Sequence, residues 1–96
     1  MRAMVGLCTL DLHLPESLTL KDKRSVLKSM LQRLRQEHRV ASAEIDLLDD
    51  PQMARIAFAA VSNSSQQLNE VLQLALRWIE RNYPQVEVLS DQIEIL

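Results

Sequence analysis

The sequence predicts a two-layer α+β domain in which six elements follow one another in the order βαββαβ. Two segments repeat apolar residues at three- and four-residue steps, which is typical of a helix with one buried face. Four other segments indicate strands, because they are short and either alternate in hydrophobicity or are nearly all apolar. The 96 residues suit one hydrophobic core, so residues 1–96 are expected to form a single domain.

The first strand and the first helix are expected over Met4–Leu14 and Leu20–Glu37. From position 10 onward every second residue of the strand is leucine, with polar residues between, which requires a sheet with one buried face. Pro15 ends the strand because it has no N–H to donate. Ser17 or Thr19 is placed to cap the helix. The buried stripe of this helix is predicted to contain Leu20, Leu27, Met30, Leu31 and Leu34.

The middle of the chain is expected to form two strands joined by a turn. Val40–Leu48 alternates in polarity, and residues 49–52 have the Asp-Asp-Pro-Gln composition of a turn. Ala54–Val61 is nearly all apolar, which predicts a central strand with both faces partly covered. Phe58 is expected to lie in the core from this strand.

The second helix is expected over Ser65–Asn82 and the last strand over Val86–Leu96, as one strand or as two short ones. Ser64 followed by Gln67 matches a capping box, and Pro84 ends the helix. The order of the six elements is that of the ferredoxin-like sandwich, in which a four-stranded antiparallel sheet carries both helices on one face. The buried stripe of the second helix is predicted to contain Leu68, Val71, Leu72, Ala75 and Ile79.

The composition excludes several classes of protein. Gly6 is the one glycine, which excludes the glycine-rich loops that bind nucleotides. Cys8 is the one cysteine, so an internal disulfide and a cysteine-rich zinc site are excluded, and a buried, inert thiol is expected. The apolar stretch near the N-terminus is too short for a signal peptide or a membrane span. We therefore expect a cytoplasmic protein with no membrane contact, no metal and no cofactor.

The strongest functional signal is a run of basic residues on the first helix. The net charge of the chain is −2, but Ser17–Arg39 contains seven Lys and Arg residues against two acidic ones. Clustered cations are typical of surfaces that bind RNA or another polyanion, and they also occur on ordinary solvated helices. The candidate nucleic-acid-binding residues are Lys21, Lys23, Arg24, Lys28, Arg35 and Arg39.

A second hypothesis is a homodimeric protein-interaction module. Phe58 is the one aromatic residue on the expected central strands, so base stacking of the RNA-recognition type is not expected on the open sheet face. On the second helix, Leu74, Leu76 and Trp78 lie at or beyond the edge of the buried stripe, where they either widen the buried face or anchor a partner. The open face is expected to carry Val5, Leu7, Thr9, Ala57 and Ala59, and the candidate interface residues are Val5, Leu7, Leu74 and Trp78.

A third hypothesis is a small enzyme with a site around His13. His13 and His38, together with Asp46, Asp49 and Asp50, supply groups that transfer protons or bind metals. Their spacing matches no known metal or triad motif, so the alternative is that they are solvated residues at the ends of elements.

A longer motif covers the start of the first helix. Residues 12–15 read Leu-His-Leu-Pro, residues 17–18 read Ser-Leu, and residues 20–29 read Leu-Lys-Asp-Lys-Arg-Ser-Val-Leu-Lys-Ser. This block resembles the signature of the YlxP-like bacterial proteins, a family of small proteins of unknown function. Further agreement at residues 40–44, 60–63, 86–88 and 93–96 extends the resemblance over almost the whole chain.

The resemblance implies a cytoplasmic protein with a ferredoxin-like fold. Genes of the family often lie beside those for ribosome maturation and translation initiation factors, which implies a role near ribosomal RNA or a ribosomal subunit. The family motif matches Lys21, Lys23, Arg24 and Lys28 residue by residue, and it assigns no catalytic residue. Residues 49–54 depart from the family's Asp-x-Trp-Gln-Arg-Ala-like pattern, because the Trp and the Arg are missing, so no function of this loop is carried over.

Overall fold

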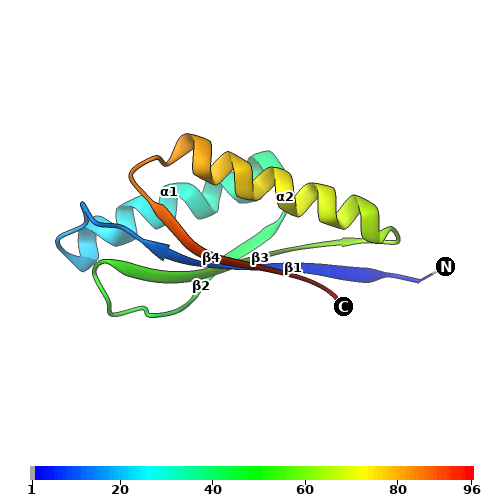
Figure 1. Cartoon of the computed structure of the whole chain (residues 1–96), viewed down its shortest axis with the longest axis horizontal. Coiled ribbons are helices and arrows are strands. Elements are labelled where there is room, and N and C mark those ends of the chain that lie inside the picture. Colours follow the sequence, from blue (N-terminus) through cyan, green and yellow to red (C-terminus); the bar gives the residue numbers. More distant parts are fainter. Residues whose placement is uncertain (1) are drawn as a thin grey trace.

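The computed structural model describes residues 2–96 and confirms the predicted order and layers (Figure 1). Within these residues, four antiparallel strands form one sheet in the order β2-β3-β1-β4, and both helices cover the same face. None of the helices in residues 2–96 has the length and apolar character needed to span a bilayer. The elements are β1 (Met4–His13), α1 (Leu20–His38), β2 (Ala41–Asp46), β3 (Met53–Ser62), α2 (Ser65–Asn82) and β4 (Glu87–Ile95).

The core lies between the sheet and the helices, and it is built by alternation along the two central strands. Cys8, Leu10 and Leu12 of β1 are fully buried, while the residues between them are partly exposed on the other face. Ile56 and Phe58 of β3 are buried in the same way, which confirms that the phenyl ring belongs to the core. Each such aliphatic or aromatic side chain contributes about 1.5–3 kcal/mol by leaving water.

Gly6 lets α2 approach β1 closely. A Cβ atom at this position would lie 2.9 Å from Leu72 Cδ1, so this side chain would have to shift, and 3.2 Å from Leu68 Cβ, which is tighter than an ordinary contact. The one glycine of the chain therefore favours close helix–sheet packing.

The caps of the two helices differ from each other. Thr19 and Asp22 form a complete capping box at the start of α1, because each side chain accepts a hydrogen bond from the other's backbone N–H. At α2 the Ser64 hydroxyl accepts the N–H of Gln67, as predicted. The return bond of the predicted box is replaced, because the Gln67 side chain instead accepts a hydrogen bond from Ser62 Oγ.

The hairpin between β2 and β3 corrects one predicted boundary. The strand expected to reach Leu48 ends at Asp46, because Leu47 adopts a left-handed backbone conformation with φ of 62°. The Asp46 side chain accepts the N–H of Leu47, and Asp50 N–H donates to the carbonyl of Leu47, so the chain turns here. The last strand is continuous over Glu87–Ile95, with its pairing register shifted opposite Asp11 and Leu12.

Candidate functional site

A stripe of cations runs along the outer side of α1 and onto the residue that ends it. All five side chains are exposed, as the helical spacing predicts. Within residues 2–96, none of the five has a carboxylate within 4.0 Å, whereas the neighbouring Arg33 pairs with Glu37 at 3.7 Å. Their charge is therefore not neutralised within these residues, although Arg35 Nη2 donates to the carbonyl of Ser42 at 2.9 Å. This cation stripe consists of Lys21, Arg24, Lys28, Arg35 and Arg39.

A polar hollow of about 410 Å³ lies on the exposed side of α1, beside the cation stripe. Tyr83, which follows α2, contacts the helix here, and its hydroxyl lies 2.9 Å from Ser29 Oγ. The Arg33 guanidinium lies 4.7 Å from the centre of the Trp78 ring and bridges the two helices by a cation–π contact. This helix hollow is lined by Ser25, Lys28, Ser29, Gln32, Arg33 and Gln36.

Trp78 and Leu74, two of the candidate interface residues, occupy different environments on α2. The Trp78 ring is half-buried against the core and also contacts the rings of His38 and Tyr83. Leu74 is 57% exposed on the outer side of the helix. Leu76 is buried, so the buried face of α2 is broader than the predicted stripe.

Lys23 does not belong to the cation stripe, which corrects its prediction as a nucleic-acid-binding residue. Its side chain has 0% exposure, and its ammonium faces the hairpin between β2 and β3. Nζ donates to three backbone carbonyl oxygens, at 2.9 Å for Leu47, 3.4 Å for Leu48 and 3.0 Å for Met53. These three bonds use every N–H of the ammonium.

A carboxylate completes the site around Lys23. Glu44 Oε2 lies 2.9 Å from Nζ, but it makes no hydrogen bond of acceptable geometry among the described residues. Because the carbonyls take the three N–H groups, Glu44 stabilises the ammonium by its charge. We call Lys23, Glu44 and the three carbonyls the lysine clamp. It ties the first turns of α1 to β2 and to the hairpin, and it compensates a cation that would otherwise be costly to bury.

The spacing of residues on α1 contains a signal for the burial of Lys23. It lies four residues before Leu27, and Met30 and Leu34 continue the same stripe. Helical spacing therefore places residue 23 on the buried face of α1. Lysine is rarely fully buried, and the acceptors that make burial possible come from a hairpin more than twenty residues away.

Charge is divided between the two layers of the molecule. The two helices contain eight Lys and Arg residues against four Asp and Glu, whereas the rest of the chain contains three against nine. The helix layer is thus positive and the sheet layer negative, although the whole chain has a net charge of only −2. An anion approaching the molecule is attracted to the helices and repelled by the sheet.

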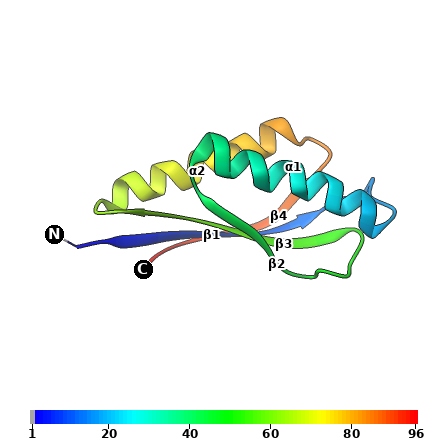
Figure 2. The same ribbon diagram turned by 180° about the vertical axis from the view of Figure 1, so that it is seen from behind.

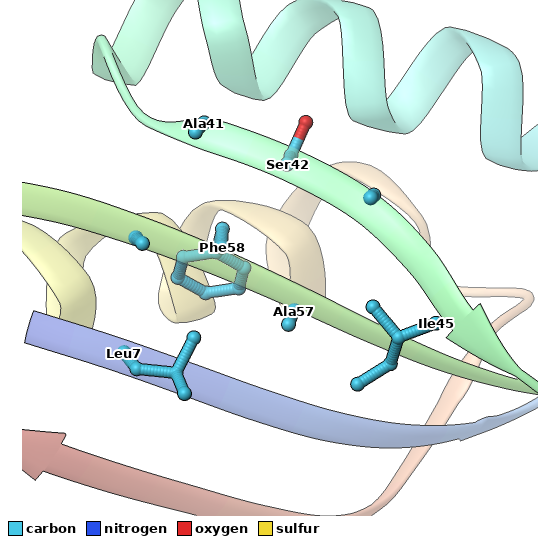
Figure 3. Close-up of a pocket in the computed structure, with 8 residues that line it drawn as sticks. Leu7, Ala41, Ser42, Ile45, Ala57 and Phe58 are labelled. Atoms are coloured by element: carbon cyan, nitrogen blue, oxygen red, sulfur yellow. The ribbon is translucent and has the colours of Figure 1, made fainter.

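The face of the sheet opposite the helices, which we call the open sheet face, is apolar over its centre. Val5, Leu7, Ala57 and Ala59 lie there on paired strands, as predicted, and Thr9 lies in the same row as Ala57. A shallow hollow of about 230 Å³ lies over β1, β2 and β3 (Figure 3). This sheet hollow is lined by Leu7, Ala41, Ser42, Ala43, Ile45, Ala57, Phe58 and Ala59.

The orientation of β2 explains why this face is apolar. Ser42 Oγ donates to the carbonyl of Leu31 on α1, and Glu44 faces Lys23, so these two polar residues of β2 point toward the helix, whereas Asp46 at the end of the strand pairs with Arg55 on the open side. Ala41 and Ala43 therefore point to the open side and are exposed. Figure 3 shows the Ser42 side chain directed toward the helix, away from Leu7.

A polar network borders the sheet hollow. Arg55 Nε donates to Asp11 Oδ1 at 2.7 Å, Arg55 Nη1 donates to Asp46 Oδ2 at 3.1 Å, and Ser90 Oγ donates to Asp11 Oδ2 at 3.1 Å. The hydrogen bond from Arg55, followed by that from Ser90, lowers the pKa of Asp11 below its ordinary value. One guanidinium is thus shared between two carboxylates, and a negative charge is left over.

The structure brings His13 to the same end of the sheet as the β2–β3 hairpin and leaves His38 apart, at the end of α1. His13 lies opposite Met53 and Glu87 at the end of the sheet that also carries the β2–β3 hairpin, and its Nδ1 is 3.6 Å from Glu87. His38 contacts Trp78 at the end of α1. Asp50 accepts the N–H groups of Gln52 and Met53. Residues 2–96 contain no group of three His, Cys, Asp or Glu side chains arranged to hold a metal ion.

Cys8 is buried in the core, as predicted. Burial, with a smaller contribution from the charge of Asp91, raises the pKa of its thiol to about 12. The thiol therefore stays protonated and unreactive at neutral pH.

The family is decided by comparison with known proteins. Residues 5–93 match the profile of a family described as "Protein of unknown function (DUF503)". The chain belongs to this family. A curated DUF503-like relative, the "Uncharacterized protein YlxP" of Bacillus subtilis (strain 168), is 33% identical over 84 residues, which cover 88% of this chain and 90% of the relative. The predicted resemblance to the YlxP-like proteins is confirmed.

One solved structure supports the fold of this DUF503 chain. The de novo designed protein Foldit4 is similar with a TM-score of 0.56 and 11% identity, and the match covers 99% of this chain and 97% of the designed one. A second designed protein, described as having a ferredoxin fold, shows 12% identity and a TM-score of 0.49 over 97% of this chain and 82% of its own. At such identities the similarity concerns the fold alone.

Proposed function

We propose that this protein is a non-catalytic binding module that contacts RNA, and ribosomal RNA in particular, through the outer face of α1. The observation that carries the proposal is the cation stripe, in which five exposed side chains have no carboxylate partner within residues 2–96. Clustered, unpaired Lys and Arg residues on one helix face are typical of surfaces that neutralise phosphates. The gene neighbourhood that the resemblance to the YlxP-like proteins implies favours ribosomal RNA over other polyanions.

The mechanism would be neutralisation of phosphates along the helix. From Lys21 to Arg39 the stripe spans about 27 Å at a rise of about 1.5 Å per residue, which is enough for several successive phosphates. The hydroxyl and amide groups of the helix hollow supply further donors to phosphate oxygens. The negative sheet layer orients the module, because it repels RNA from the opposite side.

The test is binding of purified ribosomal subunits, followed by co-sedimentation over a range of salt concentrations. If all five cations contact phosphates, the logarithm of the affinity should fall with the logarithm of the salt concentration with a slope of roughly −4. The double variant Lys21→Glu and Lys28→Glu should weaken binding strongly and reduce this slope. The control Arg77→Glu and Arg81→Glu changes the net charge equally, but places the change on α2.

The two double variants separate a local surface from an effect of total charge. Equal loss of binding in both would show that only net charge matters, and unchanged binding after the α1 reversals would overturn the proposal. Circular dichroism of each variant checks that the fold is retained, which is expected because all four positions are exposed.

A second function, association with another protein or with a second copy, is supported by a different surface. The open sheet face exposes apolar residues, of which Val61 is 70% and Ile45 51% exposed. Contiguous exposed apolar residues of this kind mark interaction surfaces more often than they mark ordinary solvated ones. Sedimentation equilibrium of the free protein tests whether the surface is covered by a second copy.

A further inference from the structure

We propose that the open sheet face docks a basic protein segment, which inserts an aliphatic side chain into the sheet hollow between flanking Lys or Arg residues. The inference rests on the second proposed function, protein association, and does not depend on RNA binding by α1. Two features of the open sheet face indicate the chemistry of the partner: the shape of the sheet hollow and the charges on the same face.

The hollow suits an aliphatic side chain because its lining is almost entirely apolar. Alanines of β2 and β3 form its floor, and Leu7 and Ile45 stand beside it (Figure 3). Ser42 contributes little polarity, because its hydroxyl is directed to α1. A side chain without polar atoms therefore fills the hollow without leaving a donor or acceptor unpaired.

The charges that share this face favour a basic partner. The pairing register places Asp11 and Asp46 beside Arg55, Glu87 opposite His13, and Glu94 opposite Leu7. Four carboxylates thus share this face with one guanidinium, that of Arg55, which already pairs with Asp11 and Asp46, and with the imidazole of His13, whose Nδ1 lies 3.6 Å from Glu87. We call these four carboxylates the acidic rim.

The acidic rim also decides between the possible occupants. A second copy that packed its open sheet face onto this one would bring two acidic rims together. RNA would be repelled for the same reason. A segment with Lys or Arg on both sides of an aliphatic residue matches both the hollow and the rim. Because the helices cover only the other side of the sheet (Figures 1 and 2), the protein would hold RNA on the helix side and a basic protein on the open sheet face.

The experiment uses short fluorescent peptides and NMR spectra of the full chain. The probe alternates Lys and Leu, one control peptide alternates Lys and Ser, and a second alternates Glu and Leu. The Lys–Leu peptide should bind and shift the amide signals of Ala41, Ala43, Ala57 and Ala59, and both control peptides should bind at least about tenfold more weakly. Ala43→Lys, which fills the hollow, should abolish the binding.

Charge reversals test the rim without touching the hollow. Glu87→Lys with Glu94→Lys should weaken the Lys–Leu peptide about tenfold, whereas Glu70→Lys with Glu80→Lys, an equal change of charge on exposed positions of α2, should leave its affinity unchanged. Equal binding of the Glu–Leu peptide, or shifts confined to the helix layer, would refute the proposal. A dimer in sedimentation equilibrium that Ala43→Lys dissociates would show that a second copy covers the face, which refutes the basic partner while upholding protein association.

Discussion

The two helices lie on the same face of the sheet, but different chemistry holds each of them there (Figures 1 and 2). α2 buries five aliphatic side chains and approaches β1 at Gly6, where a Cβ atom would collide with the helix. α1 also buries aliphatic residues, but its first turns are held by the ammonium of Lys23. One attachment is apolar and non-directional, and the other is ionic and directional.

The difference bears on how the row of cations on α1 is presented. Apolar packing tolerates small rotations of a helix, because dispersion and hydrophobic contacts have little directionality. The three carbonyls and Glu44 fix the direction of the Lys23 side chain, and thereby the rotation of α1 about its own axis. Since residues 21 and 28 point away from residue 23 around the helix, the lysine clamp also sets the direction in which the cation stripe faces.

The largest effect is expected from removal of the clamp. Lys23→Met keeps most of the side-chain volume but leaves Glu44 and three carbonyls without their partner, so the free energy of unfolding should fall by about 3–5 kcal/mol. Urea denaturation followed by circular dichroism measures the change. Lys21→Met is the matched control, because this lysine is exposed two residues earlier, and its effect should stay within about 0.5 kcal/mol.

The same variant separates stability from binding. In conditions where Lys23→Met is folded, its affinity for ribosomal subunits should fall much less than that of the Lys21→Glu and Lys28→Glu double variant, because a fully buried ammonium reaches no phosphate and influences binding only through the orientation of α1. Adding Glu44→Gln should recover part of the lost stability, since it removes the uncompensated charge. Equal stabilities of the Lys23→Met and Lys21→Met variants would contradict the role assigned to the clamp.

The apolar attachment of α2 is tested by filling the gap at Gly6. Gly6→Ala introduces a Cβ atom within 3.2 Å of Leu68 Cβ, and the resulting overpacking should lower the free energy of unfolding by about 1–3 kcal/mol. Leu72→Val shortens the side chain that the new methyl group meets first. In a double-mutant cycle by urea denaturation, Gly6→Ala should therefore cost less in the Leu72→Val background. Strictly additive effects would show that α2 is not held at this contact.

Much of the fold follows from local patterns, and the comparison of the helices shows where such patterns end. The cap at Ser64 and the stop at Pro84 predict the bounds of α2, and its period predicts a buried face that is purely apolar. The same period places Lys23 on the buried face of α1, yet the chemistry of lysine favours the surface. The deciding acceptors lie on the β2–β3 hairpin, which only the folded chain brings to α1.

The candidate surfaces divide in the same way. The cation stripe is visible in the sequence because its residues share one helix and one spacing. The acidic rim combines residues of β1, β2 and β4, and its geometry depends on the strand register and on irregularities in two strand pairs. Net charge and periodicity carry no signal for such a register, so the charged border of the open sheet face appears only in the structure.

A smaller effect is expected at the hairpin that supplies the carbonyls of the clamp. Leu47 has φ of 62°, a conformation that costs a non-glycine residue about 1–2 kcal/mol. Leu47→Gly relieves this strain and keeps the carbonyl that Lys23 binds, while the glycine adds entropy to the unfolded chain, so the protein should gain less than about 1 kcal/mol of stability. Leu48→Gly, at a neighbouring residue of ordinary φ, should lower stability. Thermal or urea denaturation that showed equal losses for both would mean that the turn at Leu47 is not strained.

The smallest effect concerns the ion pair on the open sheet face, which contrasts with the buried pair of the lysine clamp. The hydrogen bond from Arg55, reinforced by Ser90, lowers the pKa of Asp11 below its ordinary value of 3.8, so the folded state favours the ionised carboxylate. This stabilisation is present above pH 3.8 and is lost as the pH falls through the lower pKa of the folded state.

Asp11→Asn should therefore be less stable than the unchanged protein at neutral pH, and the difference should shrink below pH 3.8. Urea denaturation at a series of pH values measures this convergence, with Asp49→Asn in the exposed part of the hairpin as the control. If the difference in the free energy of unfolding between the two proteins stays constant down to acid unfolding, Asp11 stabilises the fold by packing and its charge contributes nothing.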